Sequence, residues 1–155
     1  MSLEKLKILI VDDELVSRSK MTKILESIGE CFAVDNGKDA IKIYQEEADK
    51  KAPFNLITLD VNMPEVDGTQ VLFEIREFED SGKVGNMERA KILMVTAASD
   101  KDTVITSIQA GCDGYIIKPF TKESVFNKLL EPNKKSKEKV NPFEEIYKQK
   151  ANREL

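Results

Sequence analysis

The 155-residue sequence predicts an α/β fold in which a parallel sheet is covered by helices on both faces. Five short apolar runs alternate with five segments whose apolar residues recur every three or four positions, the spacing of an amphipathic helix. Several of the runs are continuously apolar, which is typical of strands buried on both faces. Five strand–helix units in series therefore predict one open, doubly wound domain.

Each predicted strand is a run rich in aliphatic residues. In chain order, the strands are expected at Lys7 to Val11, Cys31 to Val34, Asn55 to Leu59, Ile92 to Thr96 and Tyr115 to Ile117. The helices are expected around these apolar stripes: Met21, Ile24, Leu25 and Ile28; Ala40, Ile41, Tyr44 and Ala48; Val71, Leu72, Ile75 and Phe78; Val104, Ile105 and Ile108; and Val125, Phe126, Leu129 and Leu130. Gly29, Gly82 and Gly111 follow three stripes as expected helix ends, and Asp100 and Thr121 are expected to cap the starts of the last two helices.

The predicted domain covers residues 1–131, and residues 132–155 have a different composition. This segment begins with PNKKSKEKVNP, a charged run between prolines that cannot bury enough surface to fold and indicates a linker. After Pro142, the residues Phe143, Ile146 and Tyr147 have helical spacing, which permits a short amphipathic helix.

Charge and composition argue against several classes of function. The net charge is −4, and the segment from Glu131 onward carries seven Lys/Arg and five Asp/Glu, which leaves −6 on the rest. An acidic domain of this kind is not expected to bind nucleic acid. The absence of histidine excludes Ser-His-Asp catalysis and a phosphohistidine relay on this chain. Cys31 and Cys112 lack metal-binding spacing, and no long apolar span occurs, so we expect reduced thiols and a cytoplasmic protein without membrane attachment.

Charged residues follow three of the strands at the point where each strand ends: Asp12 and Asp13, then Asp60, then Lys118. Because the carboxyl ends of parallel strands meet at one edge of a sheet, we expect these side chains to lie close together. Three neighbouring carboxylates raise one another's pKa unless a cation neutralises them, and Mg²⁺ prefers such oxygen ligands. The sequence therefore predicts an Mg²⁺ site, with Asp60 as the candidate nucleophile toward phosphorus.

Three further residues fit a phosphoryl site, because phosphoryl transfer depends mainly on positioning and charge stabilisation. Lys118 and Thr96 could stabilise the phosphoryl oxygens, and the small Ala97 leaves room for a phosphate. The Lys118-Pro119 bond is a candidate cis peptide. Ordinary structural explanations exist for these residues as well, including β propensity for Thr96, surface charge for Lys118 and helix capping for the acids.

The segments VDDE, LDVNMPEVDG, VTAAS and YIIKPF, in this order on the predicted strand ends, resemble the receiver domains of two-component response regulators. The resemblance covers about residues 5–131 and implies a flavodoxin-like (βα)5 fold with strand order 2-1-3-4-5. It implies that Asp60 is the phosphoacceptor and that Lys118 pairs with the phosphate. It also implies that Mg²⁺ is held by Asp13, Asp60 and the backbone carbonyl of Asn62, and by Asp12 through a water molecule.

The same resemblance implies a signalling role. Thr96 and Tyr115 would form a switch pair, and the output surface would be the fourth helix, fifth strand and fifth helix. The phosphoryl donor would be a sensor histidine kinase or a histidine phosphotransfer protein, since this chain has no histidine, and the switch would act on a downstream protein target. We expect the chain to catalyse only its own phosphorylation and slow autodephosphorylation, so it would not be an enzyme. The amphipathic tail could serve docking or homodimer formation.

Three alternatives differ in features that the sequence displays. A phosphatase resembling the haloacid dehalogenase group needs a second Asp two residues after its nucleophile as a general acid, where this chain has Asn62. A receiver-like interaction module that works without phosphorylation would not need the acids, Thr96 and Lys118, all of which are present. A mononucleotide-binding flavodoxin relative would need a phosphate-cradling loop after the first strand, where DDELVSRS places acids instead.

Overall fold

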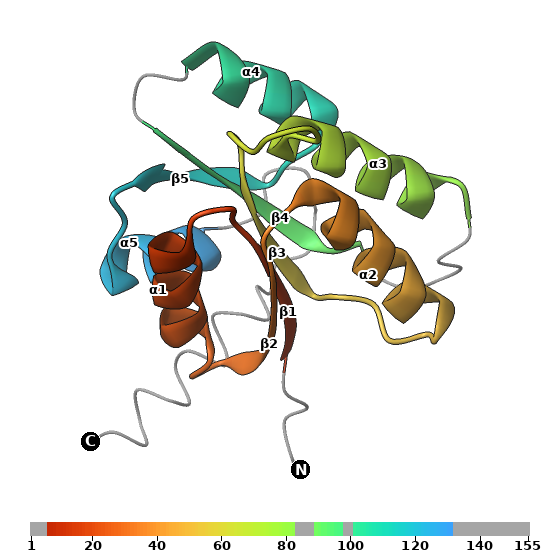
Figure 1. The fold of residues 1–155 in the computed structure, drawn as a ribbon, viewed down its shortest axis with the longest axis horizontal. Coiled ribbons are helices and arrows are strands. Elements are labelled where there is room, and N and C mark those ends of the chain that lie inside the picture. The colour runs from red at the N-terminus through yellow and green to blue at the C-terminus, as the bar shows by residue number, and fades with distance from the viewer. Residues whose placement is uncertain (1–5, 83–88, 98–100, 132–155) are drawn as a thin grey trace.

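The structure is a computed structural model, and it describes residues 6–82, 89–97 and 101–131. The predicted linker and amphipathic segment at 132–155 lie outside these residues, as does the predicted cap Asp100. The described part forms a five-stranded parallel sheet with five helices (Figure 1). None of the helices in this part is both long enough and apolar enough to span a lipid bilayer.

Strands and helices alternate along the chain, as the sequence predicts. The strands are β1 (Leu6–Val11), β2 (Gly29–Val34), β3 (Leu56–Asp60), β4 (Lys91–Ala97) and β5 (Gly114–Lys118). The helices are α1 (Leu15–Leu25), α2 (Gly37–Asp49), α3 (Gly68–Asp80), α4 (Lys101–Ala110) and α5 (Lys122–Leu130). Neighbouring strands are parallel, and their order in the sheet is β2-β1-β3-β4-β5. This order is that of the flavodoxin-like fold, so the predicted fold class is confirmed.

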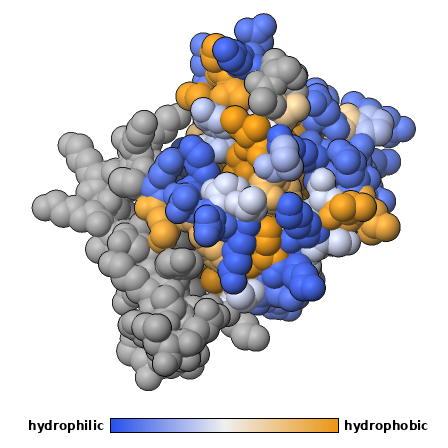
Figure 2. Space-filling model, turned by 90° about the vertical axis from the view of Figure 1, so that its left-hand side faces the viewer, coloured by the Kyte–Doolittle hydropathy of each residue, from blue (hydrophilic) through white to orange (hydrophobic). Residues whose placement is uncertain are grey.

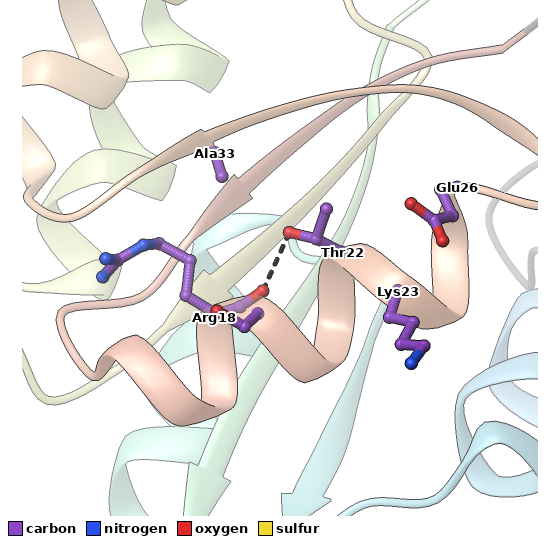
Figure 3. Close-up of a pocket in the computed structure, with 6 residues that line it drawn as sticks. Arg18, Thr22, Lys23, Glu26 and Ala33 are labelled. Carbon is purple, nitrogen blue, oxygen red and sulfur yellow. Dashed lines mark hydrogen bonds between the residues drawn. The ribbon is translucent and has the colours of Figure 1, made fainter.

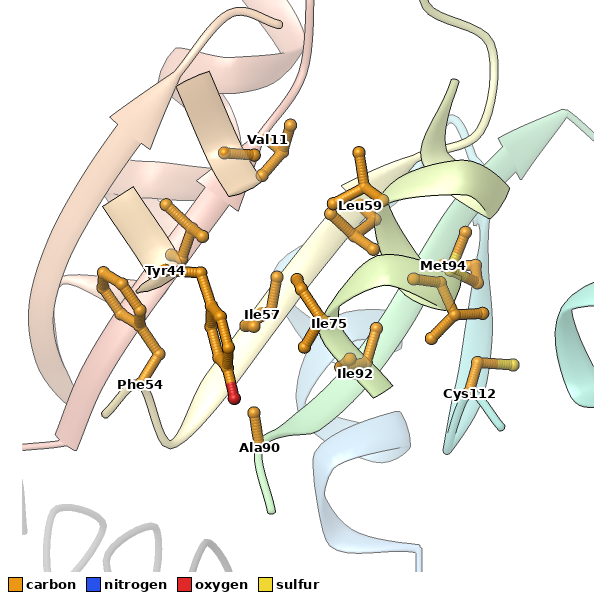
Figure 4. Packing of buried hydrophobic residues seen from close by; sticks show 14 of the residues in the cluster. Val11, Tyr44, Phe54, Ile57, Leu59, Ile75, Ala90, Ile92, Met94 and Cys112 are labelled. Carbon is orange, nitrogen blue, oxygen red and sulfur yellow. The ribbon is translucent and has the colours of Figure 1, made fainter. Parts of the chain in front are cut away.

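The helices cover both faces of the sheet. Helices α1 and α5 lie on one face, and α2, α3 and α4 lie on the other (Figure 1). Successive side chains of β1 alternate between the faces: Ile8 packs with α1 and α5, whereas Leu9 packs with α2 and α3. Figure 4 shows this second core, in which Tyr44 of α2 and Ile75 of α3 lie against the strands. The two cores hold the carboxyl ends of the strands in fixed positions.

One helix boundary differs from the prediction. The sequence pattern places Gly29 at the end of the first helix, but α1 ends at Leu25 and Gly29 is the first residue of β2. A Cβ atom on Gly29 would meet the carbonyl oxygen of Leu6 in the neighbouring strand β1. Glycine at this position therefore serves the close approach of two strands rather than the end of a helix.

The other predicted end signals are found where the sequence places them. Gly82 and Gly111 have positive φ angles, of 82° and 103°, just after α3 and α4. Thr121 precedes α5, and its hydroxyl oxygen accepts a hydrogen bond of 3.1 Å from the backbone amide of Ser124. This cap fixes the start of α5 directly after the β5 end of the sheet.

A buried arginine ties the amino edge of the sheet together. Arg76 of α3 is 6% exposed and donates hydrogen bonds to the carbonyl oxygens of Ala90 (2.8 Å) and Gly111 (2.9 Å). It also pairs with Glu79 at 2.7 Å and with Asp113 at 2.8 Å. Because Ala90 precedes β4 and Asp113 precedes β5, these contacts fix the edge opposite to the predicted site.

Candidate functional site

The predicted charged residues lie at the carboxyl edge of the sheet. Asp12 and Asp13 directly follow β1, and Asp60 and Lys118 are the last residues of β3 and β5. Within the sheet, Asp60 is paired in register with Val95 of β4, and Lys118 with the last β4 residue. The parallel topology thus brings together residues that are distant in the sequence, as the sequence predicts.

Four carboxylates gather at this edge. Oxygen atoms of Asp12, Asp13, Glu14 and Asp60 all lie within 4.8 Å of one another. Asp12 and Asp60 are each 4% exposed, whereas Asp13 and Glu14 are exposed. Such a set of oxygen ligands, half-buried and open on one side, fits a hard divalent cation.

Glu14 is a site residue to which the sequence assigns no role. It is the N-cap residue of α1, but its side chain makes no capping hydrogen bond. Its carboxylate instead lies 3.3 Å from Nζ of Lys118. An exposed acid at a helix start resembles an ordinary capping residue, so the spacing after Asp12 and Asp13 is the one signal that could have identified it.

Lys118 connects the acids across the edge of the sheet. Its Nζ atom lies 3.4 Å from Oδ2 of Asp12 and 3.6 Å from Oδ2 of Asp60, in addition to the contact with Glu14. Burial lowers the pKa of Lys118, but the three carboxylates outweigh it, so the net shift of its pKa is upward. Lys118 is therefore a permanent cation in this site.

The electrostatic environment of Asp60 is unfavourable to a free carboxylate. Burial, a hydrogen bond with Asp13 and the charge of Asp12 raise the pKa of Asp60 from 3.8 to about 7, although Lys118 opposes the shift. One ammonium thus compensates only part of the negative charge of four acids. A divalent cation bound among them would remove the remaining repulsion, so the residues fit the predicted metal site.

Backbone contacts hold the acidic loop in place. The amide of Glu14 donates to Oδ1 of Asp12 at 2.9 Å, and the guanidinium of Arg18 donates to the carbonyl oxygen of Asp12 at 2.9 Å. On the other side of the site, α3 begins against the end of β3, because a Cβ atom on Gly68 would meet the carbonyl oxygen of Asp60. Glycine at position 68 therefore allows α3 to start directly beside Asp60.

The predicted switch residues lie on neighbouring strands. Thr96 is 1% exposed, and its hydroxyl donates to the carbonyl oxygen of Ala97 at 3.3 Å. Tyr115 is paired in register with Met94, which lies two residues before Thr96 in β4. The side chains of Thr96 and Tyr115 are therefore on the same face of the sheet, the one covered by α3 and α4. The Tyr115 ring is partly buried, and Nζ of Lys128 lies 4.8 Å from its centroid.

The remaining predicted residues surround the acids. Ala97 is exposed at the end of β4, beside Lys118. The peptide bond between Lys118 and Pro119 is cis, as the sequence predicts. Asn62 lies two residues after Asp60 and is exposed at the same edge.

A separate pocket lies beside α1 and contains none of the predicted site residues. Arg18, Thr22, Lys23, Glu26 and Ala33 are among the residues that line it, from α1, the residue that follows it and β2 (Figure 3). Both signs of charge occur on its wall, and Thr22 donates its hydroxyl to the carbonyl oxygen of Arg18. The acid cluster therefore remains the site with the clearest chemistry.

Comparison with known proteins identifies the family to which the chain belongs. The family described as "Response regulator receiver domain" matches residues 8–130. The probable transcriptional regulator ycf27 of Cyanophora paradoxa is 37% identical over 122 residues, which are 78% of this chain and 45% of that protein. The chemotaxis protein CheY-3 of Vibrio cholerae is 33% identical over 128 residues, which are 81% of this chain and 90% of that protein. The chain thus spans less than half the length of the ycf27 relative and nine-tenths of CheY-3.

Solved structures agree with the sequence relatives. The crystal structure of the receiver domain of the histidine kinase CKI1 from Arabidopsis thaliana, complexed with Mg²⁺ and BeF3⁻, superposes with a TM-score of 0.67 at 28% identity. The match covers 79% of this chain and 87% of that domain. Sequence, topology and site geometry lead to one conclusion: the chain belongs to the response regulator receiver domain family.

Proposed function

We propose that this chain is the phosphoacceptor of a two-component phosphorelay and that Asp60 takes the phosphoryl group. The observation that carries the proposal is the position of Asp60 at the end of the central strand β3, among three other acids and 3.6 Å from Lys118. A nucleophile at this position is backed by a buried strand and shares the edge of the sheet with the exposed Asp13 and Glu14.

The donor is a phosphohistidine on a sensor histidine kinase or a histidine phosphotransfer protein, because this chain contains no histidine. A carboxylate oxygen of Asp60 attacks the phosphorus atom and forms an acyl phosphate. The phosphorus–nitrogen bond breaks, and its electron pair leaves with the imidazole of the donor. In autodephosphorylation, a water molecule attacks the phosphorus atom, the bond between phosphorus and the Asp60 oxygen breaks, and inorganic phosphate leaves while the carboxylate is restored. The chain therefore acts on itself and turns over no separate substrate.

The acids would hold Mg²⁺. Asp13, Asp60 and the backbone carbonyl of Asn62 would be the protein ligands, with Asp12 acting through a water molecule. When bound, Mg²⁺ supplies positive charge that offsets the repulsion among the acids and the charge of the phosphoryl oxygens. The four acids within 4.8 Å support this choice, as does the presence of Mg²⁺ in the CKI1 receiver complex.

Lys118, Thr96 and Ala97 would receive the phosphoryl group. Lys118 would exchange part of its contact with Asp12 and Glu14 for the phosphoryl oxygens. The hydroxyl of Thr96 is one residue past Val95, the register partner of Asp60, so a rotation of its side chain would bring it toward the group. Ala97 offers space at the open edge.

The signal would leave through α4, β5 and α5. Rotation of Thr96 toward the phosphoryl group frees space behind it, which Tyr115 would fill, and this change favours one of two arrangements of the surface. Three large apolar residues are exposed on α4 and β5: Ile105 (54%), Ile108 (45%) and Ile117 (44%). Figure 2 shows the molecule from the side of α1, β5 and α5, where hydrophobic residues lie among hydrophilic ones. A downstream protein is the expected target, and a second copy of the chain is the other candidate partner.

We place the protein in the cytoplasm. Cys31 and Cys112 are free thiols, as is usual in a reducing compartment. A cytoplasmic location would also give the chain access to a kinase that draws its phosphoryl group from ATP.

Intact mass spectrometry tests the proposal. The protein is incubated with a small-molecule phosphodonor, with Mg²⁺ or with EDTA, and the mass gain of one phosphoryl group is followed. We expect the mass gain only with Mg²⁺ and only in the wild-type protein, whereas Asp60→Asn should remain unlabelled. A labelled Asp60→Asn protein would refute the assignment, and an unlabelled wild type would favour a phosphorylation-independent interaction module.

A further inference from the structure

Helix α1 contacts both halves of the site. Arg18 donates to the carbonyl oxygen of Asp12, which lies in the acidic half. Two residues later, Lys20 reaches the segment that carries the basic half, where its Nζ atom donates to the carbonyl oxygen of Phe120 at 2.5 Å. The same Nζ atom lies 5.0 Å from the centroid of the Phe120 ring.

The segment that Lys20 contacts sets the backbone position from which the Lys118 side chain extends. Phe120 is 3% exposed and its ring belongs to the core between α1 and α5, so the end of the segment is embedded. Lys118 is held at the other end by its register with Ala97 of β4. The carbonyl group of Phe120 directly follows this embedded position, and Lys20 of α1 supplies its hydrogen-bond donor.

We infer that Lys20 is a positioning residue for Lys118 and acts through the backbone of residues 118–120. This inference rests on the proposed function, because it assigns Lys20 a role in the phosphorylation of Asp60. Nζ of Lys118 must remain within reach of three carboxylates and then of the phosphoryl group, and displacements of about 1 Å can cost large factors in rate. Lys20 itself touches neither the acids nor the phosphoryl group.

The matched variants are Lys20→Met, Lys20→Arg and Lys23→Met. Methionine keeps the apolar stem and removes the donor and the charge, whereas arginine keeps both. Lys23 lies on the same helix and lines the separate pocket beside α1 (Figure 3). Lys23→Met makes the same change in net charge and retains the hydrogen bond from Lys20 to Phe120.

Two measurements separate positioning from a general loss of structure. Backbone amide NMR spectra without phosphodonor should show shifts of Lys118 and Phe120 in Lys20→Met and not in Lys23→Met. With phosphodonor at saturating Mg²⁺, Lys20→Met should be phosphorylated on the order of 10-fold more slowly. Its Mg²⁺ affinity by calorimetry should be unchanged, since Lys20 contacts no acid, and Lys20→Arg should regain most of the rate.

Normal phosphorylation of Lys20→Met, or equal losses in Lys20→Met and Lys23→Met, would overturn the inference. A parallel loss of Mg²⁺ affinity would also overturn it, because the whole site would then have loosened. If the wild type is phosphorylated normally but the Lys118 and Phe120 amide signals do not move in Lys20→Met, the role of Lys20 is rejected and the proposed function stands. If the wild-type protein accepts no phosphoryl group, the proposed function is rejected, and with it the kinetic role of Lys20.

Discussion

Nζ of Lys118 lies 3.6 Å from Oδ2 of Asp60, although their strands β5 and β3 are separated by β4 in the sheet. The contact is made because both residues end their strands at the same edge and the long lysine side chain crosses the end of β4. The contact places the predicted nucleophile beside the cation that would balance the negative charge of the phosphoryl group on Asp60. Its geometry depends on the whole sheet rather than on any local motif.

Asp60→Asn should stabilise the metal-free protein at neutral pH. Burial and the neighbouring acids raise the pKa of Asp60 to about 7 in the folded protein, against an ordinary value of 3.8. Below pH 3.8 the carboxyl is protonated in both states. Between these values only the unfolded chain releases the proton, so wild-type stability falls relative to the variant as pH rises through this window and the difference is constant above it.

The expected gain at pH 8 is about 1–2 kcal/mol, allowing for solvent screening at the open edge. Urea unfolding in EDTA at pH 4 and pH 8 measures it, with the exposed Asp102→Asn as control. A gain of the same size at both pH values would contradict the electrostatic explanation. Added Mg²⁺ should stabilise the wild type at pH 8 and reduce its disadvantage.

Lys118→Met should change phosphorylation and metal binding in opposite directions. The variant loses the ammonium that would stabilise the phosphoryl oxygens, so its phosphorylation rate should fall by about 100-fold. It also loses a cation that competes with Mg²⁺ for the same carboxylates, so its Mg²⁺ affinity should be equal or higher. Intact mass kinetics and calorimetry measure the two effects. Lys122→Met on α5 is the control, and weaker Mg²⁺ binding by Lys118→Met would count against this account.

Arg76→Met should destabilise the fold without altering the site chemistry. The substitution leaves the buried carboxylate of Glu79, whose side chain is 2% exposed, without its closest cation. Removal of one partner from a buried ion pair costs about 3–5 kcal/mol. Urea unfolding measures the loss. Arg89→Met, which changes an arginine that is 56% exposed and contacts the same Glu79, should cost less than about 1 kcal/mol. Similar losses in both variants would show that burial is not the cause.

Thr96→Ala should separate phosphorylation from the switch. The variant retains the acids and Lys118, so mass spectrometry should still detect the phosphoryl group on Asp60. The proposed switch needs the Thr96 hydroxyl to turn toward this group, so in the variant the Tyr115 ring should keep its unphosphorylated NMR shifts. Thr106→Ala on the exposed part of α4 serves as control. A Tyr115 response equal to that of the wild type would remove Thr96 from the switch.

The sequence predicts the acids and Lys118 because the relevant rule is simple: parallel strands end at one edge. Asp60 and Lys118 follow apolar runs, so their meeting requires only the topology. The cis bond before Pro119 is likewise indicated by a proline directly after an apolar strand. The assignment of separate metal and switch roles, by contrast, depends on the family resemblance and not on spacing.

The features that escape prediction depend on orientation in three dimensions. Glu14 is an exposed acid at a helix start, and its contact with Lys118 joins residues that are 104 positions apart in the sequence. Arginine is usually exposed, so the buried position of Arg76 has no signal in the sequence. Gly29 follows an apolar stripe and resembles a helix end, but it is used for the close contact with β1.

The fit between Gly68 and the carbonyl group of Asp60 has a mechanical consequence. No side chain separates the two backbones at this junction, so we expect the first turn of α3 to follow any displacement of the Asp60 backbone. A spin label or fluorophore attached at Thr69 would therefore register a displacement of β3 at its source, before that displacement spreads to the rest of the domain.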